Sequence, residues 1–327
     1  MKVLVTGANG HIGSHVVREL LAHNHQVRAF VRATADLQGI DGLNIEKVYG
    51  DVQQYETLET AAQGCDAIIH LAAVYKLNAK DLDEIVKPAV EGTQNIMKAA
   101  SKAGIKRVVY TSSIASIGFS TDPNTLRTSN DWAEDPRDAY NYAKKVSDQE
   151  AQRLAKQYHI DLITICPAIV LGILDYKLTP SNKMIMDFIK RATPTFIGGN
   201  NFVNVKDVAK IHVAALTQGQ AGQRYIVGGE NISFKKLGQT LSKLTQRFII
   251  YMPFPRFMML ASGQMADALQ KIGINLPFSH NVIYDAVARY GYFDISNTQA
   301  DFNWQPIPLE QTLQECIGWL KEQKRLK

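Results

Sequence analysis

The stretch Lys2 to Gly13, KVLVTGANGHIG, decides the fold class of this 327-residue chain. An apolar strand runs directly into a loop with glycines at positions 7, 10 and 13, and a helical pattern follows. Gly7 permits a tight turn, Gly10 lets the backbone approach a pyrophosphate, and Gly13 allows the helix to pack closely on the strand. Because the N-terminus of a helix attracts negative charge, this stretch predicts a strand, a phosphate-binding loop and a helix.

The same alternation of strand and helix continues through the first half of the chain. The predicted strands are Lys2–Thr6, Gln26–Val31, Ile45–Tyr49, Ala67–Leu71, Arg107–Ser112 and Asp161–Cys166. The predicted helices are Ile12–Ala22, Leu58–Gln63, Val90–Ala103 and Asp138–Gln157. This pattern predicts an α/β fold, a doubly wound parallel sheet of the Rossmann type with helices on both faces.

The rhythm becomes irregular after Pro167, with glycines, prolines and asparagines and then longer helices. We therefore predict a dinucleotide-binding domain over residues 1–170 and a smaller substrate-binding region over residues 171–327. A further strand, Arg224–Val227, predicts that residues from about 201 to 228 return to the first domain.

Residues just after the predicted strands are candidate cofactor ligands, because ligands of such sheets bind beyond the carboxyl ends of the strands. Arg32 ends the second strand, where many dinucleotide sites have an acidic residue. A guanidinium there can bind a 2′-phosphate, so we expect NADP(H) to be preferred, with NAD(H) possible. The other candidate cofactor-binding residues are Gly7, Asn9, Gly10, His11, Ile12, Gly13, Asp51, Val52, Leu71, Ala72, Ala73, Thr111, Ser112, Tyr140 and Lys144.

Three residues are candidates for catalysis: Ser113, Tyr140 and Lys144. Tyr140 and Lys144 are four residues apart, which places them on one side of the predicted helix. Ser113 follows the fifth strand, close to where that helix should pass. In a carbonyl reduction, Tyr140 would donate a proton to the substrate oxygen and Ser113 a hydrogen bond. We expect Lys144 to lower the pKa of the phenol and to hold the nicotinamide ribose.

Composition excludes several other classes of protein. The cysteines Cys65, Cys166 and Cys316 have no paired spacing, which argues against a disulfide framework or a metal site. The chain shows no signal peptide and no apolar run of the roughly 18 residues that span a bilayer, so we expect a cytoplasmic protein without stable membrane insertion. A net charge of +5 without interleaved aromatic residues predicts no nucleic-acid binding.

These motifs resemble the extended short-chain dehydrogenase/reductase family, within it the dihydroflavonol 4-reductase-like group, and the epimerase/dehydratase proteins related to it. The family's Tyr-x-x-x-Lys matches Tyr140 and Lys144, and its serine matches Ser113. The segment after the sixth strand is similar to the family's cofactor-side proline segment, which implies that Pro167, Ile169 and Val170 also bind the cofactor. The resemblance also implies that Arg32 selects NADP.

Two departures from the family patterns narrow the range of substrates and reactions that we expect. Gly118 stands where plant flavonoid reductases have a polar side chain, which argues against a flavonoid. Ile114 and Ala115 stand where nucleotide-sugar dehydratases have an acidic pair, so that elimination chemistry lacks its acid and base.

The leading hypothesis is an NADPH-dependent carbonyl reductase that converts a ketone or aldehyde to an alcohol, reversibly. A nucleotide-sugar epimerase with tightly bound NAD is the alternative, and a non-catalytic NADP-sensing protein is a third. The apolar stretches 171–200 and 248–265 favour a fairly apolar carbonyl substrate. A monomer and a homodimer are equally compatible with the sequence.

Overall fold

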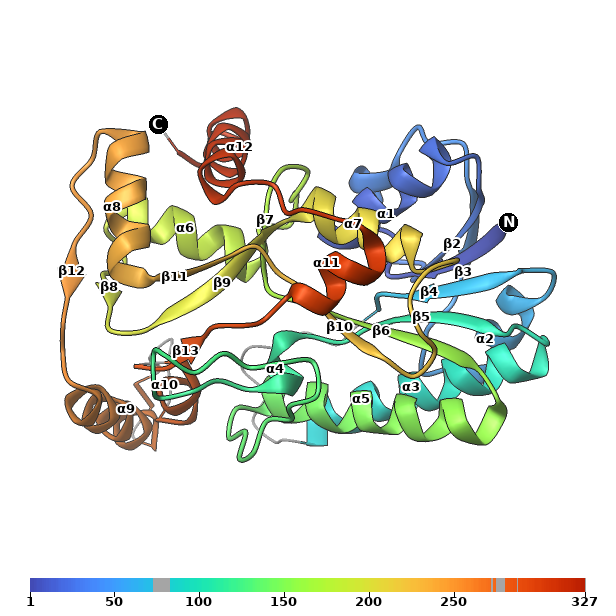
Figure 1. The fold of residues 1–327 in the computed structure, drawn as a ribbon, viewed down its shortest axis with the longest axis horizontal. Coiled ribbons are helices and arrows are strands. Elements are labelled where there is room, and N and C mark those ends of the chain that lie inside the picture. Colours follow the sequence, from blue (N-terminus) through green and yellow to red (C-terminus); the bar gives the residue numbers. More distant parts are fainter. Residues whose placement is uncertain (73–82, 272, 275–279, 287, 327) are drawn as a thin grey trace.

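The computed structural model describes residues 1–72, 83–271, 273–274, 280–286 and 288–326. In these ranges seven strands form a parallel sheet in the order β10-β6-β5-β4-β1-β2-β3 (Figure 1). They are β1 (Lys2–Thr6), β2 (Gln26–Val31), β3 (Glu46–Tyr49), β4 (Ala67–His70), β5 (Arg107–Thr111), β6 (Asp161–Pro167) and β10 (Arg224–Val227). The order reverses beside β1, so the sheet is doubly wound, as the sequence predicts.

Helices cover both faces of this sheet. One face carries α1 (His11–Ala22) and α7 (Val205–Ala214), and the other carries α2 (Tyr55–Ala62), α3 (Asp83–Lys102) and α5 (Ala139–Tyr158) (Figure 1). Strand β1 shows why: Val3 and Val5 pack into the core under α1 and α7, and Leu4 packs into the core under α3 and α5. The two-residue period of a strand sends alternate side chains to opposite faces, so a sheet covered on both sides needs apolar residues at every position.

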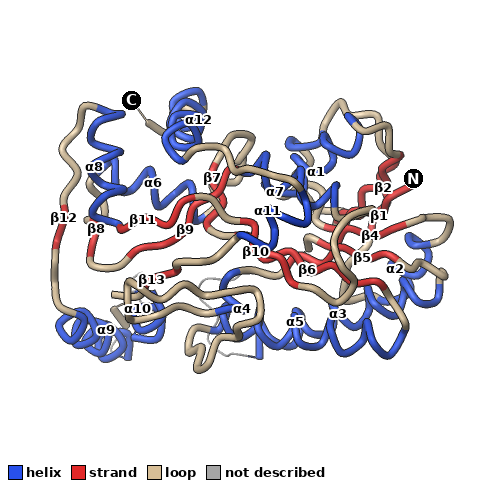
Figure 2. The backbone as a smooth tube through the Cα atoms, in the orientation of Figure 1, coloured by secondary structure: helices blue, strands red, loops and turns tan. Residues whose placement is uncertain are grey.

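A second, smaller sheet lies beside the first (Figure 2). Strands β11 (Glu230–Ser233), β9 (Gly199–Asn204) and β13 (Tyr290–Gly291) are neighbours in it, and β7 (Ile169–Leu171) also pairs with β9. The helices α6 (Pro180–Lys190), α8 (Phe234–Thr245) and α12 (Leu309–Glu322) share a core with this sheet.

The remaining elements are short or lie at the edges of the molecule. They are η1 (Gln38–Ile40), α4 (Ile114–Ile117), β8 (Thr195–Phe196), β12 (Tyr251–Met252), α9 (Arg256–Lys271), α10 (His280–Ala286) and α11 (Ser296–Phe302). None of the helices within the described ranges combines the length and the apolar character that crossing a bilayer requires.

The edge strand β10 arrives from the second half of the chain. Its residues pair with β6, Arg224 opposite Thr164 and Val227 opposite Pro167. The predicted strand is therefore present in the main sheet. The division of the chain near residue 170 stays a prediction.

Candidate active site

The glycine loop has the geometry that its sequence predicts. Gly7 has a φ of +68°, in the left-handed region that favours glycine, and Gly10 donates its N–H to the Gly7 carbonyl at 3.0 Å. A Cβ on Gly13 would lie 2.1 Å from the Gly7 carbonyl oxygen. Gly13 therefore allows α1 to sit directly against the turn.

The side chains next to the glycines make hydrogen bonds to the protein backbone. Asn9 donates from Nδ2 to the Asp36 carbonyl at 2.9 Å. His11 and His15 both place Nε2 on the Ile173 carbonyl, at 2.9 and 3.0 Å. Burial lowers the pKa of both imidazoles, that of His15 to about 4, so both are neutral Nε2–H donors at pH 7. They tie α1 to the segment after β7.

His11 and Ile12 remain predicted cofactor ligands at the start of α1. Ile12 is partly buried against the core under α1, and both residues belong to the first turn of the helix, beside the glycine loop.

Most predicted ligands at the strand ends lie along the carboxyl edge of the sheet. Arg32 is exposed directly after β2 and makes no side-chain hydrogen bond or ion pair with the described residues. Asp51 accepts from the Gln53 N–H at 3.0 Å, and the Val52 carbonyl accepts from Asn95 Nδ2 at 3.0 Å.

The edge beyond β4 is anchored on Thr6. Leu71 donates its N–H to the Thr6 carbonyl at 3.2 Å, and Ala72 donates to Thr6 Oγ1 at 3.2 Å. Ala73, also a predicted ligand, lies outside the described residues.

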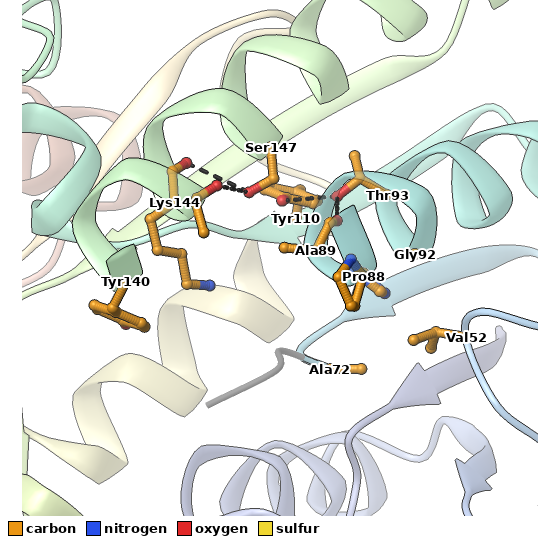
Figure 3. Close-up of a pocket in the computed structure, with 12 residues that line it drawn as sticks. Val52, Ala72, Pro88, Ala89, Gly92, Thr93, Tyr110, Tyr140, Lys144 and Ser147 are labelled. Carbon is orange, nitrogen blue, oxygen red and sulfur yellow. Dashed lines mark hydrogen bonds between the residues drawn. The ribbon is translucent and has the colours of Figure 1, made fainter. Parts of the chain in front are cut away.

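Helix α5 brings the three predicted catalytic residues together. Asp138 caps the helix by accepting from the N–H groups of Tyr140 and Asn141, at 3.1 and 3.2 Å. Tyr140 therefore lies in the first turn and Lys144 one turn later, and both project toward the same space (Figure 3). The Tyr140 hydroxyl is hydrogen-bonded to the side chain of Ser113.

Two further contacts hold this arrangement. Ser113 caps α4, and its Oγ accepts from the Ala115 N–H at 3.1 Å. The ammonium of Lys144 donates to the Thr111 carbonyl at 3.2 Å, which joins α5 to the end of β5.

The electrostatics differ from the expectation in one respect. Burial raises the pKa of Tyr140, and the hydrogen bond with Ser113 opposes that change only in part. The lowering of the phenol pKa expected from Lys144 does not outweigh the effect of burial. The phenol of Tyr140 is therefore neutral at pH 7. Burial also lowers the pKa of Lys144 from 10.5 to about 8, although the carboxylate of Asp148 acts in the opposite direction.

The hydroxyls that precede Ser113 point elsewhere. Thr111 Oγ1 is 2.8 Å from Nε2 of His212 on α7, and Ser112 donates to Asp148 Oδ2 at 2.7 Å. The two side chains point to opposite faces of the sheet, because side chains alternate along a strand. A cofactor-binding role for Thr111 or Ser112 stays a prediction, which rests on their positions next to Ser113 in the sequence.

The predicted proline segment continues from β6 into the small sheet. Pro167 is the last residue of β6, and Ile169 and Val170 lie in β7, where they pair with Phe202 and Val203 of β9. Their positions connect the carboxyl edge of the main sheet to the second region, and their contacts with a cofactor stay a prediction.

A pocket opens beside Tyr140 and Lys144, between α3, α5 and the ends of β4 and β5 (Figure 3). Its lining residues are Val52, His70, Ala72, Pro88, Ala89, Gly92, Thr93, Tyr110, Tyr140, Ala143, Lys144 and Ser147. Ala143, Ser147 and the α3 residues of this set are not among the site residues that the sequence predicts. The small residues at positions 89, 92 and 143 are the signal that could have found them, since they let two helices border a ligand space closely.

Two aromatic residues of the pocket are neutral. Tyr110 hydrogen-bonds to Thr93 Oγ1 at 3.1 Å, and burial raises the pKa of its phenol to about 12. His70 stacks on Tyr110 and faces Thr6 Oγ1 at 2.8 Å, and burial lowers its pKa to about 3. With both groups uncharged, Lys144 supplies the positive charge at this end of the pocket.

A buried ion pair lies beneath the site and was not predicted from the sequence. Arg224 Nε is 3.2 Å from Asp148 Oδ2, and the two side chains are 7% and 0% exposed. The same carboxylate oxygen accepts from Ser112 and Ser116, and Arg224 also donates to Ser116 Oγ at 2.7 Å. This network joins β10, α4, α5 and the residue that precedes Ser113.

Residues 3–228 match the NAD dependent epimerase/dehydratase family. The chain belongs to this family. The membership confirms the predicted resemblance and indicates an enzyme of the oxidoreductase or epimerase type.

Relatives of this epimerase/dehydratase family member include reductases. A putative dihydroflavonol 4-reductase of Synechocystis sp. is 33% identical over 97% of this chain and 94% of its own length. A sterol demethylase protein B of Methylococcus capsulatus is 32% identical over 98% of this chain and 99% of its own length. Cinnamoyl-CoA reductase 2 of Medicago truncatula is 33% identical, over 68% and 70%.

Solved structures of similar fold confirm the fold class. The crystal structure of gox2253 has a TM-score of 0.87 and 29% identity and covers 99% of each chain. A UDP-glucose 4-epimerase of Thermus thermophilus in complex with NAD has a TM-score of 0.77 at 17% identity, over 98% and 99%.

The glycine loop of this family member fits a dinucleotide. A Cβ on Gly7 would lie 2.8 Å from the Ala72 backbone nitrogen, so only glycine leaves the loop this compact. Gly10 occupies the N-cap of α1, and the described residues supply no side-chain cap there. The first N–H groups of the helix are therefore suited to phosphate oxygens.

Proposed function

We propose that this protein is an NADPH-dependent reductase that converts a ketone or aldehyde to an alcohol, reversibly. The observation that carries the proposal is a neutral Tyr140 phenol, hydrogen-bonded to Ser113 and one helical turn from Lys144, at the edge of a pocket. We further propose a fairly apolar carbonyl substrate, a cytoplasmic location, and a monomer or homodimer.

The cofactor would lie along the carboxyl edge of the main sheet. Gly10 and the first turn of α1 would hold the pyrophosphate, Arg32 the 2′-phosphate, and Lys144 the nicotinamide ribose. The adjoining loop and strand ends would line the rest: Gly7, Asn9, His11, Ile12, Gly13, Asp51, Val52, Leu71, Ala72, Thr111, Ser112, Pro167, Ile169 and Val170. A bound NADPH supplies the hydride.

The side chains of this site handle the proton. As hydride reaches the carbonyl carbon, negative charge grows on the oxygen, and Tyr140 donates its proton there. Ser113 donates a hydrogen bond to the same oxygen. The raised pKa of Tyr140 keeps the proton in place until it is needed, and the ammonium of Lys144 favours the phenolate that remains.

Named relatives favour the reductase over a nucleotide-sugar epimerase. The dihydroflavonol and cinnamoyl-CoA reductases are 33% identical to this chain, whereas the NAD-bound epimerase is 17% identical.

Loss of NADPH absorbance with a panel of ketones and aldehydes would support the reductase. Tightly held NAD in the purified protein, with no net oxidation of NADPH, would favour the epimerase. NADPH binding that changes the affinity for a protein partner, without turnover, would favour a sensor.

The cofactor preference is tested by Arg32→Asp. The substitution removes a charge-assisted bond to the 2′-phosphate, so we expect kcat/KM for NADPH to fall by roughly 10- to 100-fold. The value for NADH should not fall, because NADH lacks that phosphate and an acidic residue at this position can bind the ribose hydroxyls. Lys102→Asp, at an exposed lysine in the last turn of α3, is the charge-matched control. Equal losses with both dinucleotides would show that Arg32 does not read the phosphate.

The charge of Lys144 should set an alkaline limit on NADPH use. The pKa of Lys144 is lowered to about 8, so the cation is present below that pH and is lost as the pH rises through it. We expect kcat/KM for NADPH, which reports groups of the free enzyme, to decline above about pH 8. Lys144→Arg should remove this decline within the same pH range, because a guanidinium stays charged. A wild-type profile that stays flat to about pH 10 would contradict the assignment.

A further inference from the structure

Exposed apolar side chains are concentrated in one segment of the chain. Ten large apolar side chains of the described residues are exposed, and six of them lie between positions 248 and 274. They are Phe248, Phe254, Phe257, Met258, Met265 and Ile274. Phe257 is 71% exposed and Phe248 70%, values far outside those of a packed core. Scattered exposed residues need no explanation, but a local concentration of this kind marks an interaction surface.

Helix α9 is apolar on the side that faces away from the protein. Phe257, Ala261 and Met265 are spaced by four residues, and Met258 is seven residues before Met265, so all four lie along one side. The other side is the packed one: Gly263 is buried, and a Cβ there would lie 2.8 Å from the Cα of His280 on α10. The exposed stripe is therefore a second apolar face without a partner among the described residues.

The exposed residues line one end of the molecule. Figure 1 shows α8, β12 and α9 following one another along that end, at the left of the view. Phe248 precedes β12, Phe254 follows it, and the stripe of α9 comes next. We call this end, residues 190–200, 233–271 and 273–274, the α8–α9 end.

The α8–α9 end is strongly basic. It contains one acidic residue, Asp267, while the rest of the chain has 30 acidic residues and 28 lysines and arginines. Its own basic residues are Lys190, Arg191, Lys235, Lys236, Lys243, Arg247, Arg256 and Lys271. The net positive charge of the protein is thus carried by the end that also contains the exposed phenylalanine side chains of the described residues.

The cations lie beside the apolar residues. Arg191 donates from Nε to the Phe248 carbonyl at 3.0 Å, and Lys235 Nζ lies 5.7 Å from the ring centroid of Tyr251. Lys243 faces Glu310 of α12 at 3.5 Å, and Asp267 accepts from the His280 N–H at 3.1 Å. These two carboxylates are fewer than the eight basic residues of the α8–α9 end, so the end keeps an excess of positive charge.

We propose that the α8–α9 end docks the protein on the surface of a bilayer that contains anionic phospholipid. Exposed Phe and Met side chains would enter the boundary between headgroups and acyl chains, and the lysines and arginines would contact lipid phosphates. Five of the eight basic residues are lysines, which are depleted at protein interfaces, so a lipid surface fits better than an acidic protein. A second copy would bring two positive ends together, which opposes self-association. The proposal does not rest on the proposed reductase activity.

Vesicle sedimentation of the full-length protein tests the proposal. We expect binding to vesicles of phosphatidylcholine with phosphatidylglycerol, little binding to phosphatidylcholine alone, and release by salt. The triple variant Phe257→Ser, Met258→Ser, Met265→Ser should bind at least roughly tenfold more weakly, because its stripe is polar. Lys235→Gln with Lys236→Gln, both exposed, should also bind roughly tenfold more weakly.

Two matched controls lie elsewhere on the surface. Leu126→Ser changes an apolar residue that is 53% exposed, and Lys102→Gln with Lys156→Gln removes two exposed charges from the last turns of α3 and α5. Both should bind vesicles as the wild type does. Hydrogen exchange of the wild type adds a measurement that needs no variant, since vesicles should protect residues 248–271.

Several outcomes would overturn the proposal. They are absence of vesicle binding, equal weakening in the controls, and hydrogen-exchange protection elsewhere than residues 248–271. A dimer of the wild type that the triple variant abolishes, without vesicle binding, would assign the surface to a second copy of the chain.

Discussion

Replacing Tyr140 with phenylalanine should lower kcat for carbonyl reduction by roughly 10²- to 10⁴-fold, the usual contribution of a positioned general acid. Phenylalanine keeps the ring beside the pocket and removes the hydroxyl that is bonded to Ser113. The substrate oxygen would then have to take its proton from water. NADPH binding, followed by its fluorescence, should change much less, because the glycine loop and Arg32 are intact.

Tyr142→Phe is the matched control for this experiment. Tyr142 lies two residues further along α5 and is 41% exposed, so it is on a different side of the helix from Tyr140. Its loss should leave kcat unchanged. If Tyr140→Phe turned over carbonyls at the wild-type rate, or if both variants lost activity equally, Tyr140 would not be the proton donor.

Replacing Arg224 with methionine should lower the free energy of unfolding by about 3–5 kcal/mol, the usual cost of leaving one member of a buried ion pair uncompensated. Asp148 is fully buried, and its Oδ1 has no hydrogen-bond partner among the described residues. The variant would also lose the bonds from Arg224 to the carbonyls of Ser129 and Asp131, at 3.0 and 2.7 Å. Urea unfolding at neutral pH measures the loss.

The double variant Asp148→Asn, Arg224→Met separates the charge from the packing. It carries no uncompensated carboxylate, so it should regain at least about half of the lost free energy. Burial raises the pKa of Asp148, so in the single variant this carboxyl takes up a proton as the pH falls, and the penalty should shrink toward acid pH. A single variant as stable as the wild type, or a double variant no better than the single, would contradict this account.

The main sheet could be predicted because its signals are local. The strands Lys2–Thr6, Gln26–Val31 and Arg224–Val227 have the predicted bounds. Helix α3 begins at Asp83 instead of Val90, and Pro88 lies inside it. A proline usually marks a boundary, but Ile85 is buried in the turn before it, and such packing outweighs the lost hydrogen bond.

The site was only partly predictable for the same reason. A spacing of four and the Asp138 cap place Tyr140 and Lys144 without any knowledge of the tertiary structure. Asp148 and Arg224 are 76 residues apart, and each looks like an ordinary surface charge in its own helix or strand. No local pattern indicates that Ser112 turns toward that pair.

The position of β10 means that residues 1–170, the predicted dinucleotide-binding domain, would not fold as an independent domain. A chain ended at residue 170 would leave the outer edge of β6 unpaired and would lack Tyr225 and Ile226, which are 1% and 0% exposed. An open strand edge of this kind invites aggregation. Conversely, cleavage of the chain by a protease between residues 171 and 223 should leave two fragments that stay associated through the pairing of β6 with β10. They should separate only in denaturant.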